Sequence, residues 1–228
     1  MRFDILTIFP ESLDSYFNSS ILSRAQKNKL ITISTHDIRK QSTDKHHRVD
    51  DTPYGGGPGM VIQIEPVVKT LQKIYPAKRG SATCDKTTRV ILLTPRGKTL
   101  DQNKVRQLAK YKRLIFIAGH YESIDARIDN FVDEKISLGN FVLTGGELVA
   151  ACVIDAVSRL VPGVVGKEES VRDESFSSYN KAGGQFNIEY PQYSRPEQFK
   201  GLKVPEVLLS GNHKKIKEWR DSQSKQRV

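Results

Sequence analysis

Two short apolar stretches decide the fold: Arg-Val-Ile-Leu-Leu-Thr at residues 89–94 and Arg-Leu-Ile-Phe-Ile-Ala at residues 113–118. Each has the length of a strand and is apolar almost throughout, without the alternation of a strand that faces water on one side. Such strands are typical of a parallel sheet that is buried on both faces.

Helices and strands are predicted to alternate around these two stretches. Further strands are expected over residues 2–9 and 30–36, with short elements over 124–138. Helices are expected over residues 11–27 (one or two short ones), 65–74, 100–111 and 147–160. This order predicts an α/β fold, a parallel sheet with helices on both faces.

The chain has 228 residues, of which 37% are hydrophobic, enough for one sizeable domain and a small second one. The composition changes at residues 161–185, where glycine, proline, serine and charged residues are mixed. We therefore predict a first domain over 1–160, a linker over 161–185 and a short, basic, helical C-terminal domain over 186–228.

Cysteine usage and hydropathy indicate the compartment. Cys84 and Cys152 lie far apart and form no CxxC pair, which argues against a disulfide framework and a zinc site. No signal peptide is expected at the N-terminus, and no apolar run approaches the roughly 20 residues that cross a bilayer. The sequence predicts a cytoplasmic protein with no membrane partner.

The net charge of +10 is concentrated in two segments, 96–113 and the last 29 residues. Two basic surfaces fit a long polyanion such as a nucleic acid better than a small metabolite. The other explanation is a set of ordinary solvated lysines.

Three loops should meet at one edge of the sheet, because ligands bind outside the carboxyl ends of parallel strands. These loops are Thr94–Gly97, Gly119–Glu122 and Leu138–Gly146. Several glycine-bearing loops at one edge predict a nucleotide-like ligand.

A fourth glycine-rich stretch, Asp50–Met60, matches neither standard phosphate motif. No Lys-Ser/Thr follows it as in a P-loop, and it lacks the last glycine of a dinucleotide fingerprint. His46 and His47 are adjacent, which suits no metal spacing, and no nucleophile elbow is present. The chemistry is therefore expected to depend on acids, arginines and shaped backbone, with no metal ligands predicted.

Six ordered motifs resemble the bacterial tRNA (guanine-N1)-methyltransferase family (TrmD) of the SPOUT superfamily, over almost the whole chain. They lie at residues 8–11, 49–60, 94–97, 119–125, 142–147 and 208–213. The resemblance implies a deep trefoil knot, S-adenosylmethionine bound bent in its loops, and a homodimer with active sites at the subunit interface. It also implies methylation of guanine N1 at tRNA position 37, with a need for magnesium.

The resemblance carries the cofactor contacts onto the three loops. The implied residues are Thr94, Pro95, Gly119, Tyr121, Glu122, Leu138, Gly139, Asn140, Phe141, Val142, Leu143, Gly145 and Gly146. Two residues depart from the family pattern: His120 stands where arginine is usual, and Ser123 where glycine is usual.

Two catalytic roles are implied by the same resemblance. Arg159 corresponds to the residue that stabilises guanine O6, although an i,i+4 pair with Asp155 is the structural alternative. The family ends its linker motif in Glu-Asp-Ser-Phe, whereas residues 173–176 are Asp-Glu-Ser-Phe. Ungapped alignment makes Glu174 the general base, and a local slip would present Asp173 instead.

For the RNA, Gly57, Pro58 and Gly59 are expected to offer bare backbone to the guanine, with Asp50 or Asp51 reading a neighbouring base edge. The alternative for the acids is turn formation. The basic C-terminal segment is expected to contact tRNA phosphates, less tightly than in relatives that continue beyond this short end. The competing functions are a SPOUT methyltransferase acting on another RNA and a non-catalytic RNA-binding relative.

Overall fold

The structure is a computed structural model that describes residues 1–76, 85–166, 174–176, 179–180 and 185–227. It divides into two compact units, Met1–Gly166 and Lys167–Val228. The boundary lies within the segment 161–185 for which the sequence predicts a linker.

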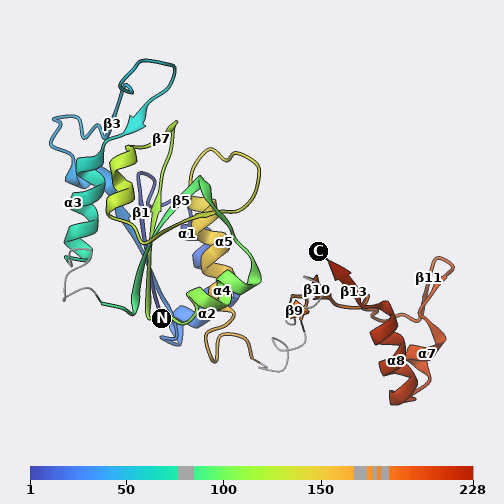
Figure 1. The fold of residues 1–228 in the computed structure, drawn as a ribbon. Coiled ribbons are helices and arrows are strands. Elements are labelled where there is room, and N and C mark those ends of the chain that lie inside the picture. Colours follow the sequence, from blue (N-terminus) through green and yellow to red (C-terminus); the bar gives the residue numbers. More distant parts are fainter. Residues whose placement is uncertain (77–84, 167–173, 177–178, 181–184, 228) are drawn as a thin grey trace. The chain divides into compact units, whose positions relative to one another are not determined.

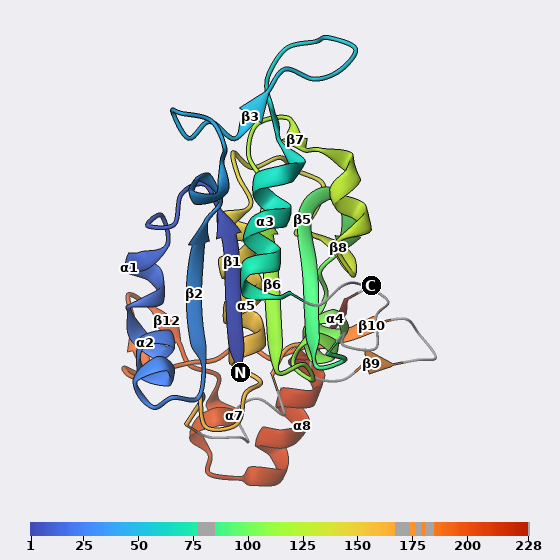
Figure 2. The same cartoon turned by 90° about the vertical axis from the view of Figure 1, so that its left-hand side faces the viewer.

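The first unit is built on a five-stranded sheet in the order β2-β1-β6-β5-β8, in which every neighbouring pair is parallel (Figure 2). Its strands are β1 (Arg2–Thr7), β2 (Thr32–Asp37), β5 (Thr88–Thr99), β6 (Arg113–Ala118) and β8 (Glu134–Ser137). The central strand β6 is buried along nearly its whole length, as its continuous apolar sequence predicts.

Side chains of β6 alternate between two separate cores. Phe116 faces one core and Ile115 and Ile117 face the other. Helices α1 (Asp14–Phe17), α2 (Ser20–Lys27), α4 (Gln102–Leu108) and α5 (Glu147–Ser158) cover the first core. Helix α3 (Ile64–Ile74) and the 3₁₀ helices η1 (Ile38–Gln41) and η2 (Ala126–Asn130) cover the second (Figure 1). The predicted fold class, a parallel sheet with helices on both faces, is confirmed; the trefoil knot stays a prediction.

Strand β5 continues past the loop predicted at Thr94–Gly97. Leu93 and Lys98 both pair with Ile136 of β8, so the residues between them bulge out of the ladder. Gly97 is needed in this bulge, because a Cβ there would lie 2.5 Å from the backbone nitrogen of Ile136. The bulge therefore presents Thr94–Gly97 at the carboxyl end of the sheet.

Residues 37–60 contain η1 and a two-residue strand. Strand β3 (Asp50–Asp51) pairs with β4 (Val61–Ile62), and β4 pairs with β7 (Ser123–Ile124). This three-stranded sheet holds both ends of the glycine-rich stretch, which extends away from the main sheet as a loop (Figure 1). We name it the glycine loop, residues 52–60.

The prediction of a basic surface over 96–113 is wrong for two of its members. Lys104 is 2.6 Å from Glu134, which also pairs with Arg89 at 3.0 Å. Arg113 is 2.8 Å from the buried Asp4. These cations neutralise carboxylates within the first unit, which charge counting along the sequence cannot reveal.

The second unit contains two helices and short antiparallel strands. Its elements are β9 (Tyr179–Asn180), β10 (Gln185–Ile188), β11 (Gln198–Phe199), β12 (Leu202–Lys203), α7 (Glu206–Leu209), α8 (His213–Gln223) and β13 (Lys225–Arg227). Lys214, Lys215 and Lys217 of α8 are exposed. Within the described ranges of both units, no helix has the length and apolar composition to cross a membrane.

Candidate functional site

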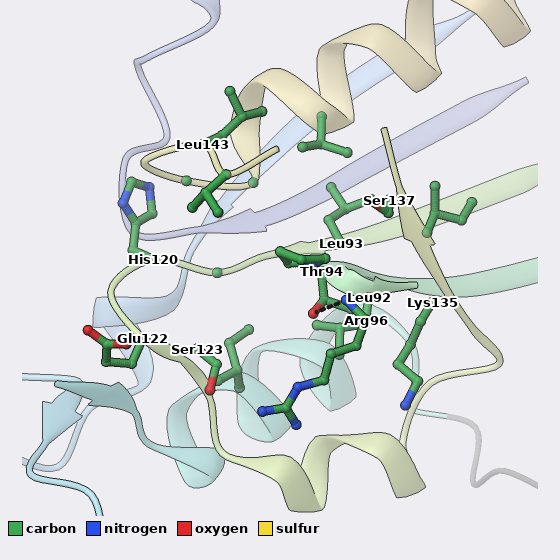
Figure 3. A pocket seen from close by; sticks show the side chains of 18 of the residues that line it. Leu92, Leu93, Thr94, Arg96, His120, Glu122, Ser123, Lys135, Ser137 and Leu143 are labelled. Atoms are coloured by element: carbon green, nitrogen blue, oxygen red, sulfur yellow. Dashed lines mark hydrogen bonds between the residues drawn. The ribbon is translucent and has the colours of Figure 1, made fainter. Parts of the chain in front are cut away.

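A pocket of about 240 Å³ opens at the carboxyl ends of β5, β6 and β8 (Figure 3). The three loops for which the sequence predicts convergence all line it. Of the residues predicted to bind the cofactor, those in the lining are Thr94, Pro95, Gly119, Tyr121, Glu122, Leu138, Phe141, Val142, Leu143, Gly145 and Gly146. Gly139 and Asn140 are outside the lining, although they lie in the same loop.

Glycines let the backbones of these loops pack closely. The Gly146 amide donates to the Gly119 carbonyl at 2.9 Å, and a Cβ at Gly146 would lie 2.8 Å from the Cα of Ala118. A Cβ at Gly119 would lie 3.0 Å from Ile124 Cγ1. The pocket wall here is therefore bare main chain, whose polar groups can form hydrogen bonds with a flat heterocycle. The side chain of Leu138 can pack against the face of such a heterocycle. These residues fit a nucleoside cofactor.

His120, noted from the sequence only as a departure, connects three elements behind the pocket. Its Nε2 is 2.8 Å from Oε2 of Glu147, the first residue of α5. The other oxygen of this buried carboxylate accepts a hydrogen bond from Thr7 at the end of β1. The His120 ring also stacks edge-on against Phe9, with centroids 4.8 Å apart. We name this set the Thr7–Glu147–His120 latch.

The residues of the latch pack closely around Gly145. His120 and Gly145 form an antiparallel β-bridge, and a Cβ at Gly145 would lie 2.5 Å from Glu147 Oε2. The turn that precedes α5 is therefore held against the end of β6. Sequence reasoning missed Glu147, although its position directly after Gly145-Gly146 is the signal that could have found it.

The open side of the pocket carries charged and polar side chains. Arg96, Glu122, Ser123 and Lys135 all lie along one side of it in the close view (Figure 3). Lys135 pairs with Asp129 at 2.8 Å. Sequence reasoning assigned no site role to Arg96 or Lys135, because a charged residue at a strand end gives no sign of which way it points.

The glycine loop adjoins the pocket at its C-terminal end. The Glu122 amide donates to the Met60 carbonyl at 3.1 Å, and a Cβ at Gly59 would lie 2.5 Å from Glu122 Cγ. Gly57 and Gly59 have φ of +117° and +83°, a region that side chains rarely adopt. Of the other predicted substrate residues, Pro58 is exposed in the loop and Asp50 pairs with Ile62 at its base. The loop and the pocket are thus neighbours within one chain.

Arg159 lies away from this pocket. It is the C-cap of α5, whereas Gly146 is the N-cap, and the 12-residue helix between them is roughly 18 Å long. The Asp155 carboxylate, its alternative partner, accepts a hydrogen bond from the Tyr16 hydroxyl at 2.7 Å, which raises the pKa of Tyr16 to about 12. One chain therefore does not bring Arg159 to its own pocket.

Glu174 belongs to the second unit. The next residue, Ser175, donates to the Glu189 carboxylate at 3.3 Å through its amide, and its hydroxyl accepts from the Glu189 amide at 3.1 Å. These bonds fix the turn that carries Glu174. Asp173 lies outside the described residues.

A resident magnesium ion has no evident set of ligands in the part of the chain that the structure describes. No three His, Cys, Asp or Glu side chains gather there in a way that could hold a metal. The need for magnesium that the resemblance implies stays a prediction.

Comparison with known proteins agrees with the geometry. The family model described as "tRNA (Guanine-1)-methyltransferase TrmD" matches residues 1–228. A tRNA (guanine-N(1)-)-methyltransferase of Carboxydothermus hydrogenoformans is 51% identical over 98% of this chain and 83% of its own. Enzymes of that name from Clostridium botulinum (strain Alaska E43) and Clostridium perfringens (strain ATCC 13124) are each 49% identical over 98% of this chain, and over 87% and 88% of their own. The chain therefore belongs to the tRNA (guanine-1)-methyltransferase TrmD family.

Proposed function

We propose that the protein transfers a methyl group from S-adenosylmethionine to N1 of the guanosine at tRNA position 37. The observation that carries this proposal is the contact between the glycine loop and the pocket at Gly59 and Glu122. A surface for a flat base lies directly beside a pocket for a nucleoside cofactor, as a transfer between the two requires.

The residues that would hold S-adenosylmethionine are those of the three loops, including Gly139 and Asn140 beside the lining. When bound, it supplies an electrophilic methyl group on a sulfonium. The chain's contribution would be orientation: the bare backbone of Gly119 and Gly145-Gly146 and the side chains of Leu138 and Phe141 line the pocket and would enclose the donor. No step is assigned to magnesium.

Guanine N1 must lose its proton before it can attack. We assign its removal to the Glu174 carboxylate, with Asp173 as the alternative, a role that contributes roughly 10²–10⁴-fold in such reactions. Negative charge then develops on O6, and we assign its stabilisation to the Arg159 guanidinium. Both assignments come from the family motifs.

Two observations support a homodimer with shared sites. Helix α5 exposes an apolar stripe that includes Leu148, at 57% exposure, and Cys152. Such a stripe on an otherwise buried helix is typical of a subunit interface. Arg159 ends the same stripe and lies at the far end of α5 from its own pocket, so we infer that it acts at the pocket of the partner subunit.

The tRNA is held, in this proposal, by the exposed lysines of α8 and by Asp50 at the base of the glycine loop. Lys214, Lys215 and Lys217 suit phosphates, whereas the Asp50 carboxylate can accept from a base edge. A tRNA substrate and these basic side chains support action in the cytoplasm.

The test uses labelled S-adenosylmethionine and unmodified tRNA transcripts that carry guanosine or adenosine at position 37. We expect label only on the guanosine transcript, with primer extension arrested at that nucleotide. Label without arrest there would favour a methyltransferase for another RNA site. Absence of label together with tRNA binding would favour a non-catalytic RNA-binding protein.

The same assay tests the general base. Glu174→Gln should abolish methyl transfer and leave the Kd for the cofactor nearly unchanged, because Glu174 is assigned to the guanine and not to the donor. Asp173→Asn is the matched control. Loss of activity in Asp173→Asn with normal turnover in Glu174→Gln would reverse the assignment.

A further inference from the structure

The charged side chains of the pocket are not all neutralised by neighbours. Lys135 pairs with Asp129 and His120 with Glu147. Arg96 differs, because its exposed side chain forms no ion pair with any residue in the described part of the chain. A cation without a partner at the rim of a pocket is available to a ligand.

Arg96 is also held in place. It lies in the bulge of β5, and its amide donates a hydrogen bond to the Thr94 hydroxyl at 3.3 Å. The next residue, Gly97, packs tightly against β8. In the close view the side chain of Arg96 extends between those of Ser123 and Lys135 (Figure 3). The backbone of Arg96 is thus held between these contacts, whereas its side chain is exposed.

The same side of the pocket presents one anion. The Glu122 carboxylate forms no ion pair in the described ranges, and Ser123 lies between it and Arg96 in the close view (Figure 3). One cation and one anion on a common wall complement a zwitterion, in which a carboxylate and an ammonium are attached to the same carbon. The amino-acid part of the proposed methyl donor has this chemistry.

We propose that Arg96 binds the carboxylate of the amino-acid part of the methyl donor, with Glu122 facing its ammonium. The inference rests on the proposed cofactor. A planar guanidinium can donate two parallel hydrogen bonds to a carboxylate, an arrangement that lysine cannot match. Arg96 would then determine that the pocket selects the complete donor over nucleosides that lack the amino acid.

The test is calorimetric binding of two nucleosides without tRNA: S-adenosylhomocysteine, which has the amino-acid part, and 5′-methylthioadenosine, which lacks it. Neither carries a sulfonium charge, so removal of a nearby cation cannot strengthen binding through the sulfur. The variants are Arg96→Gln and Arg96→Lys, with Lys98→Gln as the control, because Lys98 is an exposed cation on the same strand outside the pocket lining.

Arg96→Gln should weaken the binding of S-adenosylhomocysteine by about 10- to 100-fold, the loss expected for a charge-assisted bidentate contact. Its Kd for 5′-methylthioadenosine should stay within about twofold, Arg96→Lys should recover part of the loss, and Lys98→Gln should match the wild type. Equal weakening of both nucleosides would overturn the proposal and make Arg96 a support for the pocket wall. Unchanged binding of both nucleosides would overturn the proposal; a separate titration with tRNA that then showed weaker binding would assign Arg96 to an RNA phosphate. If the wild-type protein binds both nucleosides with the same Kd, it has no subsite for the amino-acid part. If it binds neither nucleoside, the proposed cofactor itself is wrong.

Discussion

Asp4 is fully buried in the middle of β1, and its carboxylate accepts hydrogen bonds from three side chains. His36 is 2.6 Å from Oδ1, Arg113 is 2.8 Å from Oδ2, and Arg2 contacts both oxygens at 2.8 Å. Burial alone would raise the pKa of the Asp4 carboxyl, but these hydrogen bonds outweigh burial and hold the pKa well below its usual range. The cluster joins β1, β2 and β6 through one charge.

Replacement of Asp4 by asparagine should lower the free energy of unfolding by about 3–5 kcal/mol at pH 7, because the cations around it lose their counter-charge. The folded-state pKa is depressed, so this stabilisation is present above the unfolded pKa of about 4 and is lost as the pH falls through the lower folded value. Urea denaturation of both proteins at a series of pH values measures the difference, which should narrow in acid.

The matched control is Glu65→Gln, since Glu65 pairs with Lys69 at 2.7 Å on the exposed surface of α3. Exposed pairs contribute little to stability. An equal loss in the two variants would contradict the role assigned to the buried cluster.

At the scale of single elements, substitutions in the glycine loop distinguish backbone strain alone from strain combined with a steric collision. Gly57→Ala places a methyl group in open space but in a strained backbone region, whereas Gly59→Ala also collides with Glu122. We expect Gly57→Ala to reduce methylation without change in cofactor binding, and Gly59→Ala to reduce both. Melting temperatures should fall by only a few degrees, because the strain is local and neither residue contacts a core.

Gly163→Ala is the control for backbone strain. Gly163 has φ of +84° and only an ordinary contact at 3.4 Å with Leu30, outside the pocket lining. Methylation rates and cofactor Kd values of the three variants are compared with their melting temperatures. If Gly57→Ala or Gly59→Ala unfolds the protein, the loop is structural and not a surface for the base.

The latch connects β1, β6 and α5 at the back of the pocket, and it predicts coupling between its members. His120→Leu and Glu147→Gln should each weaken the binding of S-adenosylhomocysteine by about 10-fold, because each variant releases the Gly145-Gly146 turn from the end of β6. The double variant should bind S-adenosylhomocysteine no more weakly than the weaker of the two single variants, since both changes break the same hydrogen bond, between His120 and Glu147. Calorimetry of the four proteins gives this cycle, with Lys98→Gln, outside the pocket lining, as the control. Additive losses would show that the two residues act separately.

Much of the fold follows from patterns along the chain, and the exceptions have tertiary causes. The apolar stretch 113–118 coincides with β6, because a strand buried on both faces needs no information from its neighbours. The convergence of the three loops follows from the parallel order of the strands. The bulge in β5 could not be predicted, since it depends on the register with Ile136 of β8. The pairing of Lys104 with Glu134, 30 residues apart, likewise depends on the folded sheet.

At the scale of the whole molecule, the position of Arg159 predicts complementation between subunits. Arg159→Ala and Gly145→Val should each be inactive as pure proteins, the first without its O6 partner and the second without a pocket. Mixed and re-equilibrated, they should recover about a quarter of wild-type activity, because half of the dimers combine one intact pocket with one intact arginine.

The mixture is measured by the methylation assay after co-expression or denaturation and refolding of both variants. Circular dichroism and S-adenosylhomocysteine binding of the Arg159→Ala protein establish that its own pocket is intact. A mixture that stays inactive while forming mixed dimers would mean that Arg159 acts within its own subunit.

The length of α5 has a consequence for how the protein responds to its own abundance. With the role proposed for Arg159 at the partner's pocket, turnover requires a pair of chains, whereas each chain has its own proposed donor pocket at the other end of α5. On serial dilution, specific activity should therefore fall once chains dissociate, while each separated chain still takes up the cofactor. In a cell that makes less of this protein, the rate of tRNA methylation would therefore fall more steeply than the concentration of the protein.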